Sequence, residues 1–387
     1  MNHKTSLFLI LLGTQGCAKY YSVEEACDDN VKVPGGSFML QDDLEGTWRI
    51  NCYRKLAGVG KQHAAQLVQQ EARDVLDYID LNPDAQNLFG KLRDRAFLQQ
   101  TVGASGYTGV SLYQRLTDPV TGTGYVFYDL TATETREYVK IALDYGDGTP
   151  SGKDAVDWLM RDPEFRQLAL QPSFVDGAYA EKELPAEWFT EGNFAGIFPG
   201  VDLPVGGRAY YLTSFFTKPH QEHVGKPVQL PQAEQTDVPL YSWTHENASG
   251  SQLVPAQVGY AMTFQIGAID PEHYDETNQN QYAAGISDVI ITGPEGALTP
   301  IVVVPDVSYP AADGGKLAPD GVWLRNTLAV YTWEFLQPST TYDVDIRLAT
   351  EETDWELAYS FTTVDADPGL DETLQMGGTI ITGTTTP

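Results

Sequence analysis

The chain has 387 residues, of which 42% are apolar and 20% are charged, and this composition is typical of globular proteins. Its length predicts about two or three domains. With 53 acidic and 24 basic residues the formal net charge is -29, which excludes DNA or RNA as a partner because the phosphates would be repelled.

The first residues, MNHKTSLFLILLGTQGC, predict export of the protein. A basic start precedes an apolar run from Leu7 to Leu12, which is too short to cross a hydrocarbon layer of roughly 30 Å and matches a secretory signal. The box TQGC before and including Cys17 resembles the cleavage site of bacterial lipoproteins, with Thr14 where Leu, Val or Ile is usual. We therefore expect residues 1–17 to be a signal peptide, Cys17 to carry a lipid, and the mature protein to lie at the outer membrane or cell surface. Ordinary cleavage nearby is the alternative and would give a soluble secreted protein.

Two further cysteines, Cys27 and Cys52, form an even pair in an oxidising compartment once Cys17 is lipidated. We expect a disulfide between them, which would tie an extended N-terminal arm, residues 18–45, to the first helix. Closing a loop of this length stabilises the fold by about 3 kcal/mol in the chain-entropy model. A catalytic thiol is the alternative, and no motif with a histidine partner supports it.

Residues 46–80 predict two helices with a short break between them. Apolar residues of the second helix recur at steps of three and four, as one buried stripe requires. They are Val68, Ala72, Val75 and Ile79, none of which binds a metal or moves a proton. A further helix is expected over residues 152–170, with Pro163 marking a break or a new first turn. Strand-like runs follow at 174–180, 187–198 and 208–217, so that this part of the chain predicts an α+β domain.

The C-terminal part has a different character. Residues 229–255 have the Pro, Gln and Ser content of a linker. About six or seven short strand-like runs follow within about 110 residues, which predicts an immunoglobulin-like β-sandwich over 256–364. In LQPSTTYDV, Tyr342 fits the tyrosine corner of fibronectin-type sandwiches, whose ring packs in the core while its hydroxyl bonds to upstream backbone. The tail, residues 365–387, is acidic and then rich in Thr and Gly, and we expect it to be flexible.

Candidate metal ligands occur in KPHQEHVGK, where Glu222 lies between His220 and His223. Such residues form a zinc site if their loops converge. They stand beside Pro and Gly rather than on a helix, so we favour a solvated loop and expect neither a metal nor another cofactor.

Several motifs, in this order, resemble the CAP superfamily, the family of SCP and cysteine-rich secretory proteins. INCYRKLAGV resembles the start of the bacterial members, with Asn51, Tyr53 and Arg54 as matches. SGYTGVSLYQRL and DAVDWLMRDPEFRQLALQP resemble later segments of the family. QTDVPLYSWTHE followed by a closing SFTT resembles bacterial lipoproteins that append an Ig-like domain to a CAP domain. The similarity covers most of residues 46–364.

In this family two histidines and two acidic residues line an open cavity and can hold a divalent cation. The resemblance implies that Val75, in ARDVLDY, and Phe165, in RDPEFRQ, stand at the two histidine positions. Packing would then replace metal binding in that cavity. The resemblance does not fix the two acidic residues, for which Glu134 and Glu137 are candidates.

These features predict an α+β protein with an N-terminal CAP-like α/β/α sandwich, residues 46–228, followed by a C-terminal all-β immunoglobulin-like sandwich. The resemblance implies a degenerate, non-enzymatic CAP domain that acts in binding or scaffolding at the cell envelope, with a glycan, lipid or protein as partner. One alternative is a hydrolase of cell-wall or extracellular polymer, which clustered carboxylates or histidines with shifted pKa values would favour. The other is a lipid or sterol carrier, which an apolar groove would favour.

Overall fold

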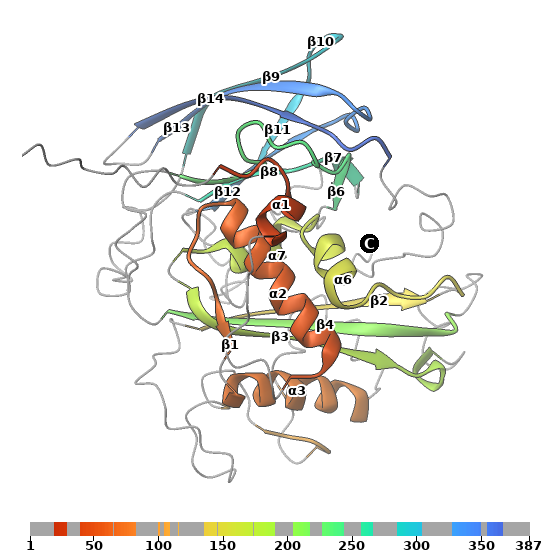
Figure 1. Cartoon of the computed structure of the whole chain (residues 1–387). Helices are drawn as coiled ribbons and strands as arrows, with labels where there is room; N and C mark the ends of the chain where they lie inside the picture. The colour runs from red at the N-terminus through yellow and green to blue at the C-terminus, as the bar shows by residue number, and fades with distance from the viewer. Residues whose placement is uncertain are drawn as a thin grey trace, which may run out of the picture.

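The computed structural model describes residues 19–28, 39–64, 66–82, 100, 104–108, 115, 135–144, 146–172, 174–189, 204–216, 227–243, 257–265, 285–303, 327–349 and 354–366. This part of the chain combines helices with sheets, which confirms the prediction of an α+β protein at that level. No helix within it is long and apolar enough to cross a bilayer. Figure 1 shows the elements stacked in layers: helix α3, a sheet, a group of helices, and two further sheets.

The N-terminal half supplies the first three layers. Its elements are α1 (Val23–Asp28), α2 (Gln41–Leu56), β1 (His63–Ala64), α3 (Gln66–Leu81), β2 (Thr135–Asp144), α6 (Gly152–Leu159), α7 (Pro163–Leu170), β3 (Phe174–Leu184), the 3-10 helix η5 (Ala186–Phe189) and β4 (Gly206–Phe216). The strands form a sheet in the order β1-β3-β4-β2, in which β1 pairs with β3 in parallel and the other neighbours are antiparallel.

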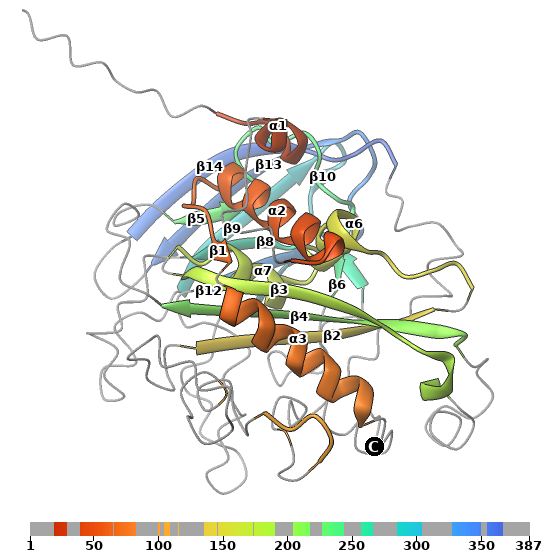
Figure 2. The same cartoon turned by 60° about the horizontal axis from the view of Figure 1, so that its bottom comes forward.

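The two faces of this sheet carry different side chains because successive residues of a strand point to opposite sides. Tyr138, Tyr210 and Leu212 join the apolar core of α2, α6 and α7 on one face. Tyr211, between the last two, points to the other face, where its hydroxyl lies near Arg115, the partner of Glu71 in α3. Figure 2 shows α3 on that side of the sheet, with α2, α6 and α7 on the other side.

Helix α7 is enclosed between two sheets, and α2 packs against β3, α6, α7 and α1. All 8 residues of α7 are buried, and α2 buries charged as well as apolar side chains. The C-terminal half supplies the sheet on the far side of α7, since Val228 and Leu230 belong to the same apolar core as these helices. A helix that buries residues around most of its circumference needs no single apolar stripe, and α2, in which only Gln41 is exposed, shows none.

The INCYRK motif has a structural role in α2. Asn51 exchanges two hydrogen bonds with the backbone of Gln62, at 2.7 and 3.0 Å, and so fixes the chain between α2 and β1. Arg54 is fully buried. It donates to three backbone carbonyl oxygens, those of Gly60, Ala169 and Gln171, at 2.6, 2.7 and 3.1 Å. The arginine therefore joins the end of α2 to the end of α7.

Pro163 begins a new helix. Helix α6 ends at Leu159, and the side chain of Asp162 accepts a hydrogen bond from the backbone N–H of Glu164 at 2.9 Å. Proline is well tolerated in the first helical turn because the N–H that it lacks has no partner there. The helical segment predicted over 152–170 is thus two helices, divided where the sequence marks a break.

The C-terminal half supplies the last two layers. Its strands are β5 (Val228–Leu230), β6 (Tyr241–Trp243), β7 (Gln257–Gly259), β8 (Met262–Gln265), β9 (Gly285–Gly293), β10 (Gly296–Ala297), β11 (Pro300–Val303), β12 (Thr327–Thr332), β13 (Thr341–Ala349) and β14 (Asp354–Thr362). Two antiparallel sheets, β10-β9-β13-β14 and β11-β12-β8-β5, share an apolar core, and β6 pairs with β7. In β13, buried and exposed residues alternate from Thr341 to Leu348, which confirms the half-buried strand predicted there.

One buried arginine links the helix layer to the C-terminal half. Arg166 of α7 donates twice to the carbonyl oxygen of Met160, at 2.6 and 2.9 Å, and once to that of Ala261. Its guanidinium lies over the ring of Tyr260, 4.4 Å from the centroid. The two halves therefore meet in a buried interface.

Three predicted boundaries need correction. The arm over 18–45 is not extended throughout, because α1 lies within it and α2 already begins at Gln41; both bury side chains against the core. The segment predicted as a linker begins inside β5, which pairs with β8, and it continues through the buried Val238 and Leu240. Residues 187–189, predicted as strand, belong to η5, which buries two aromatic rings.

Candidate functional site

The predicted site residues fall into two groups. Cys17, His220 and His223 lie outside the described residues. Val75 and Phe165 are described, and both are buried.

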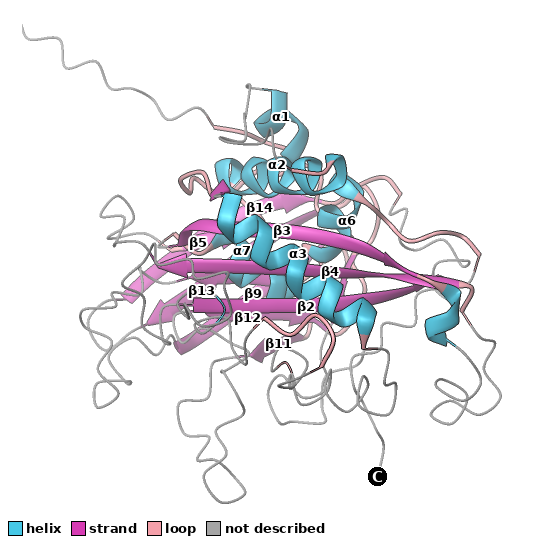
Figure 3. Ribbon diagram, turned by 90° about the horizontal axis from the view of Figure 1, so that it is seen from below, coloured by secondary structure: helices cyan, strands magenta, loops and turns pink. Residues whose placement is uncertain are grey.

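Val75 and Phe165 lie on opposite faces of the β1-β3-β4-β2 sheet. Phe165 of α7 packs edge-on against Tyr138 of β2, with ring centroids 5.3 Å apart. Val75 belongs to α3, which covers the other face (Figure 3). The expectation that the two residues line one cavity is therefore wrong. Helical spacing reveals which side of a helix is buried, but not which face of a sheet it covers.

A buried cluster of charged groups lies on the α3 face, one helical turn before Val75. It consists of Glu71, Arg115, Glu137 and Tyr211, and we call it the ionic centre. Nε of Arg115 donates to Oε1 of Glu71 at 2.5 Å, and Nη2 donates to Oε1 of Glu137. The hydroxyl of Tyr211 donates to the same Glu137 oxygen at 2.6 Å. The side chains of Glu71 and Arg115 are 2% and 0% exposed, so the centre ties α3 to β2 and β4 within the core.

Burial dominates the electrostatics of the ionic centre. It raises the pKa of Glu71 to about 7, with Arg115 acting to lower that value and Glu137 to raise it. Burial acts to lower the pKa of Arg115, but attraction by Glu137 and Glu71 outweighs it and holds the pKa above its usual value. Burial also raises the pKa of Tyr211 well above its usual range. Near neutral pH the arginine is therefore charged, the tyrosine is neutral, and Glu71 titrates.

One carboxylate oxygen of the ionic centre makes no hydrogen bond within the described residues. Among the residues that the structure describes, no group of three or more His, Cys, Asp or Glu is placed to hold a metal ion. Oε2 of Glu71 is buried and has no hydrogen-bond partner within that part of the chain. Within the described residues the centre thus has one unused acceptor.

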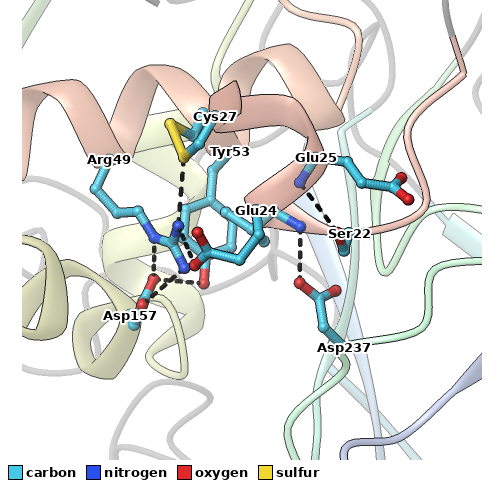
Figure 4. The surroundings of a disulfide bond; sticks show 10 residues. Ser22, Glu24, Glu25, Cys27, Arg49, Tyr53, Asp157 and Asp237 are labelled. Carbon is cyan, nitrogen blue, oxygen red and sulfur yellow. Dashed lines mark hydrogen bonds and ion pairs between the residues drawn. A yellow bond between two sulfur atoms is a disulfide. The ribbon is translucent and has the colours of Figure 1, made fainter. Parts of the chain in front are cut away.

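A second cluster surrounds a disulfide between Cys27 of α1 and Cys52 of α2, in which neither sulfur is a free thiol (Figure 4). Arg49 pairs with Asp157 of α6 at 2.6 Å and with Glu24 of α1 at 2.8 Å. It also donates to the sulfur of Cys27 at 3.3 Å. The cluster therefore fastens α1 to both α2 and α6.

The segment before α1 is bound to the C-terminal half. The backbone N–H of Val23 donates to Asp237, and that of Thr236 to the carbonyl oxygen of Tyr21, each at 2.7 Å. Lys19 pairs with Glu234 at 2.6 Å. Residues 19–28, which we call the N-terminal clasp, thus contact both halves of the molecule.

Tyr342 has the contacts that its motif predicts. Its hydroxyl accepts a hydrogen bond from the backbone N–H of Gln337 at 2.8 Å, and its ring stacks on Phe361 with centroids 5.7 Å apart. Gly293 allows this approach, since a Cβ there would lie 2.8 Å from the tyrosine ring. The residue therefore supports the sandwich core.

No model of a known protein family matches the chain, and no curated protein matches it significantly in sequence. The CAP-like and immunoglobulin-like assignments consequently remain proposals.

Sequence reasoning missed the ionic centre. A signal was present at Glu71, since a carboxylate one turn before Val75 on a buried stripe requires a partner. That partner, Arg115, lies 44 residues away in sequence, and no spacing rule connects the two.

Proposed function

We propose that the protein is an exported, non-enzymatic binding or scaffold protein of the cell envelope, with a degenerate CAP-like part and an immunoglobulin-like part. The order of the sequence motifs and a sheet covered by helices on both faces support the CAP-like assignment. Two facing antiparallel sheets and the bond from Gln337 to Tyr342 support the immunoglobulin-like assignment.

The observation that carries the non-enzymatic proposal is the position of Arg115. Its buried guanidinium pairs with both Glu71 and Glu137, so these carboxylates contact a protein cation. A general acid or base must come within hydrogen-bond reach of the proton that it transfers. Glu71, at 2% exposure, offers a substrate no such approach.

One observation favours the hydrolase alternative. Glycoside hydrolysis uses two carboxylates whose environments separate their pKa values, and burial raises the pKa of Glu71 to about 7. Opening of α3 would have to expose the ionic centre before this pair could act.

Hydrolysis assays on the mature chain distinguish the two functions. Peptidoglycan and neutral polysaccharides are incubated with the wild type and with Glu71→Gln and Glu137→Gln, and new reducing ends are measured. The scaffold proposal expects the same background from all three proteins. Release by the wild type that Glu71→Gln abolishes would establish the hydrolase instead.

We also propose that a lipid on Cys17 anchors the protein. The apolar run before the TQGC box supports this, as does the disulfide, which is typical of oxidising compartments. The test is fractionation of producing bacteria, in which Cys17→Ala should move the protein from the membrane to the soluble or precursor fraction. An unchanged membrane fraction with a mature, unlipidated N-terminus would contradict the anchor.

A further inference from the structure

Strand β14 is the last strand of the sheet β10-β9-β13-β14, so only one of its edges pairs with a neighbouring strand of that sheet. Segment 234–238 covers part of the other edge. The backbone N–H of Glu234 donates to the carbonyl oxygen of Ser360 at 2.6 Å, and that of Thr362 donates to the carbonyl oxygen of Gln235 at 2.7 Å. The even-numbered residues of β14 thus direct their backbone groups to this edge.

The rest of the same edge, over residues 354–358, is open within the part of the chain that the structure describes. Backbone groups of alternate residues in a strand point to opposite edges, so Asp354, Glu356 and Ala358 direct their N–H and C=O groups to this edge as well. No described strand or turn pairs with them there. Three residues therefore each offer a donor and an acceptor to an added strand.

The solvent-exposed face of the sheet is acidic beside the open edge. Asp354 and Glu356 are exposed on β14, and Asp343 and Asp345 are exposed on β13. The basic residue among them is Arg347, which pairs with Glu356. Four carboxylates thus face one guanidinium, so positive side chains are favoured next to this edge.

The opposite side of β14 is apolar. Trp355, Leu357 and Tyr359 alternate with the exposed residues and pack against the core that the two sheets share. They are half-buried, whereas Phe361, further along the same row, is buried. The row is therefore less covered where the edge is open, and apolar side chains of an added strand would bury it further.

These features together describe the chemistry of a ligand. Unpaired backbone groups along an edge select an extended chain, which binds by adding a strand to the sheet. Successive side chains of such a strand point to opposite faces, so basic residues would meet the acidic face while apolar residues meet the row beneath. A second copy of this chain fits poorly, because two β14 edges would bring like carboxylates together and each chain has a net charge of -29.

We propose that residues 354–358 bind an extended segment of a partner protein in which basic residues alternate with apolar ones. The segment adds a strand to the sheet beyond β14, in line with segment 234–238. This surface deepens the binding function proposed above and rests on it. Failure of peptide binding would remove the surface alone, whereas the hydrolysis assays test the binding function separately.

Fluorescence anisotropy of a labelled peptide in which lysine and valine alternate tests the edge on the full mature chain. The wild type should bind this peptide, and more weakly as salt is added. Two further peptides carry N-methyl groups either on the lysines or on the valines. Only one of these two sets of N–H groups can face β14, so one methylated peptide should bind about tenfold more weakly while the other keeps its affinity.

Substitutions in the chain test the same edge from the other side. Ala358→Pro removes an edge-facing N–H but keeps the pairing with β13, because proline is tolerated in edge strands where its nitrogen makes no ladder bond. It should weaken peptide binding about tenfold. Asp354→Lys reverses a charge beside the edge and should weaken binding about three- to tenfold.

Asp288→Lys is the matched control, since it makes the same change of charge on the same face of the sheet, two strands away from the edge. Its effect on peptide binding should stay below about twofold because solvent screens charges at that distance. Thermal unfolding shows whether each variant folds. If Ala358→Pro does not fold, the two lysine variants and the methylated peptides decide.

Four results would overturn the proposal. The first is a wild type that does not bind the alternating peptide, and the second is an equal effect of the two methylated peptides or of the two lysine variants. The third is a dimer in sedimentation that Ala358→Pro dissociates, which would assign the edge to a second copy. The fourth is binding that appears only after removal of residues 367–387, which would assign the edge to the chain's own tail.

Discussion

Helices α7 and α3 cover opposite faces of one sheet, and different contacts hold them there. Helix α7 is buried along its whole length between two sheets, and its arginine, Arg166, donates to backbone carbonyl oxygens. Helix α3 has one apolar side, and its charged residues pair with other side chains. Backbone carbonyls do not titrate over the physiological pH range, whereas carboxylates do. The arginine of α7 thus binds groups that do not titrate, whereas the charged residues of α3 pair with carboxylates and an arginine.

The largest expected effect comes from replacing the buried Arg54 of α2. Arg54→Leu leaves the carbonyl oxygens of Ala169 and Gln171 without their donor inside the core, and it removes the bond to the carbonyl oxygen of the exposed Gly60. Each unsatisfied buried group costs about 1–3 kcal/mol, so we expect the free energy of unfolding to fall by about 3–5 kcal/mol. Urea denaturation measures this, with the exposed Lys61→Ala as a control expected to stay within about 0.5 kcal/mol of the wild type. A loss for Arg54→Leu no larger than that of the control would show that these bonds do not hold the layer.

The next effect concerns the N-terminal clasp. The double substitution Cys27→Ser, Cys52→Ser removes a cross-link between residues 25 apart in sequence, which should cost about 3 kcal/mol. Urea denaturation under non-reducing conditions gives the difference. Wild-type protein treated with a reductant should approach the variant, and a variant as stable as the oxidised wild type would mean that the other contacts of the clasp suffice.

The pH dependence of the free energy of unfolding tests the role of Glu71. Burial raises the pKa of Glu71 above its unfolded value, so the folded state binds the proton more tightly and loses stability as the pH rises. From about pH 6 to about pH 8 the free energy of unfolding should fall by about 1 to 2 kcal/mol. Burial also raises the pKa values of Asp43, Asp157 and Glu181, which adds to the same trend on the acid side of this range. Urea denaturation curves collected across this pH range measure the effect. A free energy of unfolding that rises with pH would contradict the prediction.

The smallest effect lies at the exposed end of α3. Lys182→Ala removes the pairs with Asp77 and Asp80, whose side chains are in part exposed. Exposed pairs contribute about 0.2–1 kcal/mol and are screened by salt. We expect a loss in that range at low ionic strength that disappears at high salt. A loss that is unchanged by salt would mean that the aliphatic part of the lysine, rather than its charge, attaches the helix.

Sequence patterns predicted those elements whose burial follows from their own helix or strand geometry. The stripe of α3, the alternation in β13 and the break at Pro163 each reflect the geometry of a single helix, strand or turn. Strand β2 was not predicted. The length of α2 was underestimated because α2 buries polar as well as apolar residues and shows no stripe.

The candidate site was harder to predict because it depends on contacts between distant residues. Val75 was identified as a packing residue, but Glu71 on the same helix was not identified as part of a charged cluster. Its partners come from residue 115 and from two strands, and only the tertiary fold brings them together. The resemblance likewise placed Phe165 in a cavity with Val75, although the sheet separates them.

The N-terminal clasp has a consequence for the distance between the protein and a membrane. Lys19 is already paired with Glu234, and Tyr21 is bonded to Thr236. Only Ala18 lies between Cys17 and Lys19, so the chain from Lys19 to Cys17 reaches at most about 7 Å even when fully extended. A lipid on Cys17 would therefore hold the body directly against the head groups without a flexible stalk, and the segment 234–237 would lie at the surface nearest the bilayer. Whatever the protein binds would then have to approach from the side or from the opposite pole.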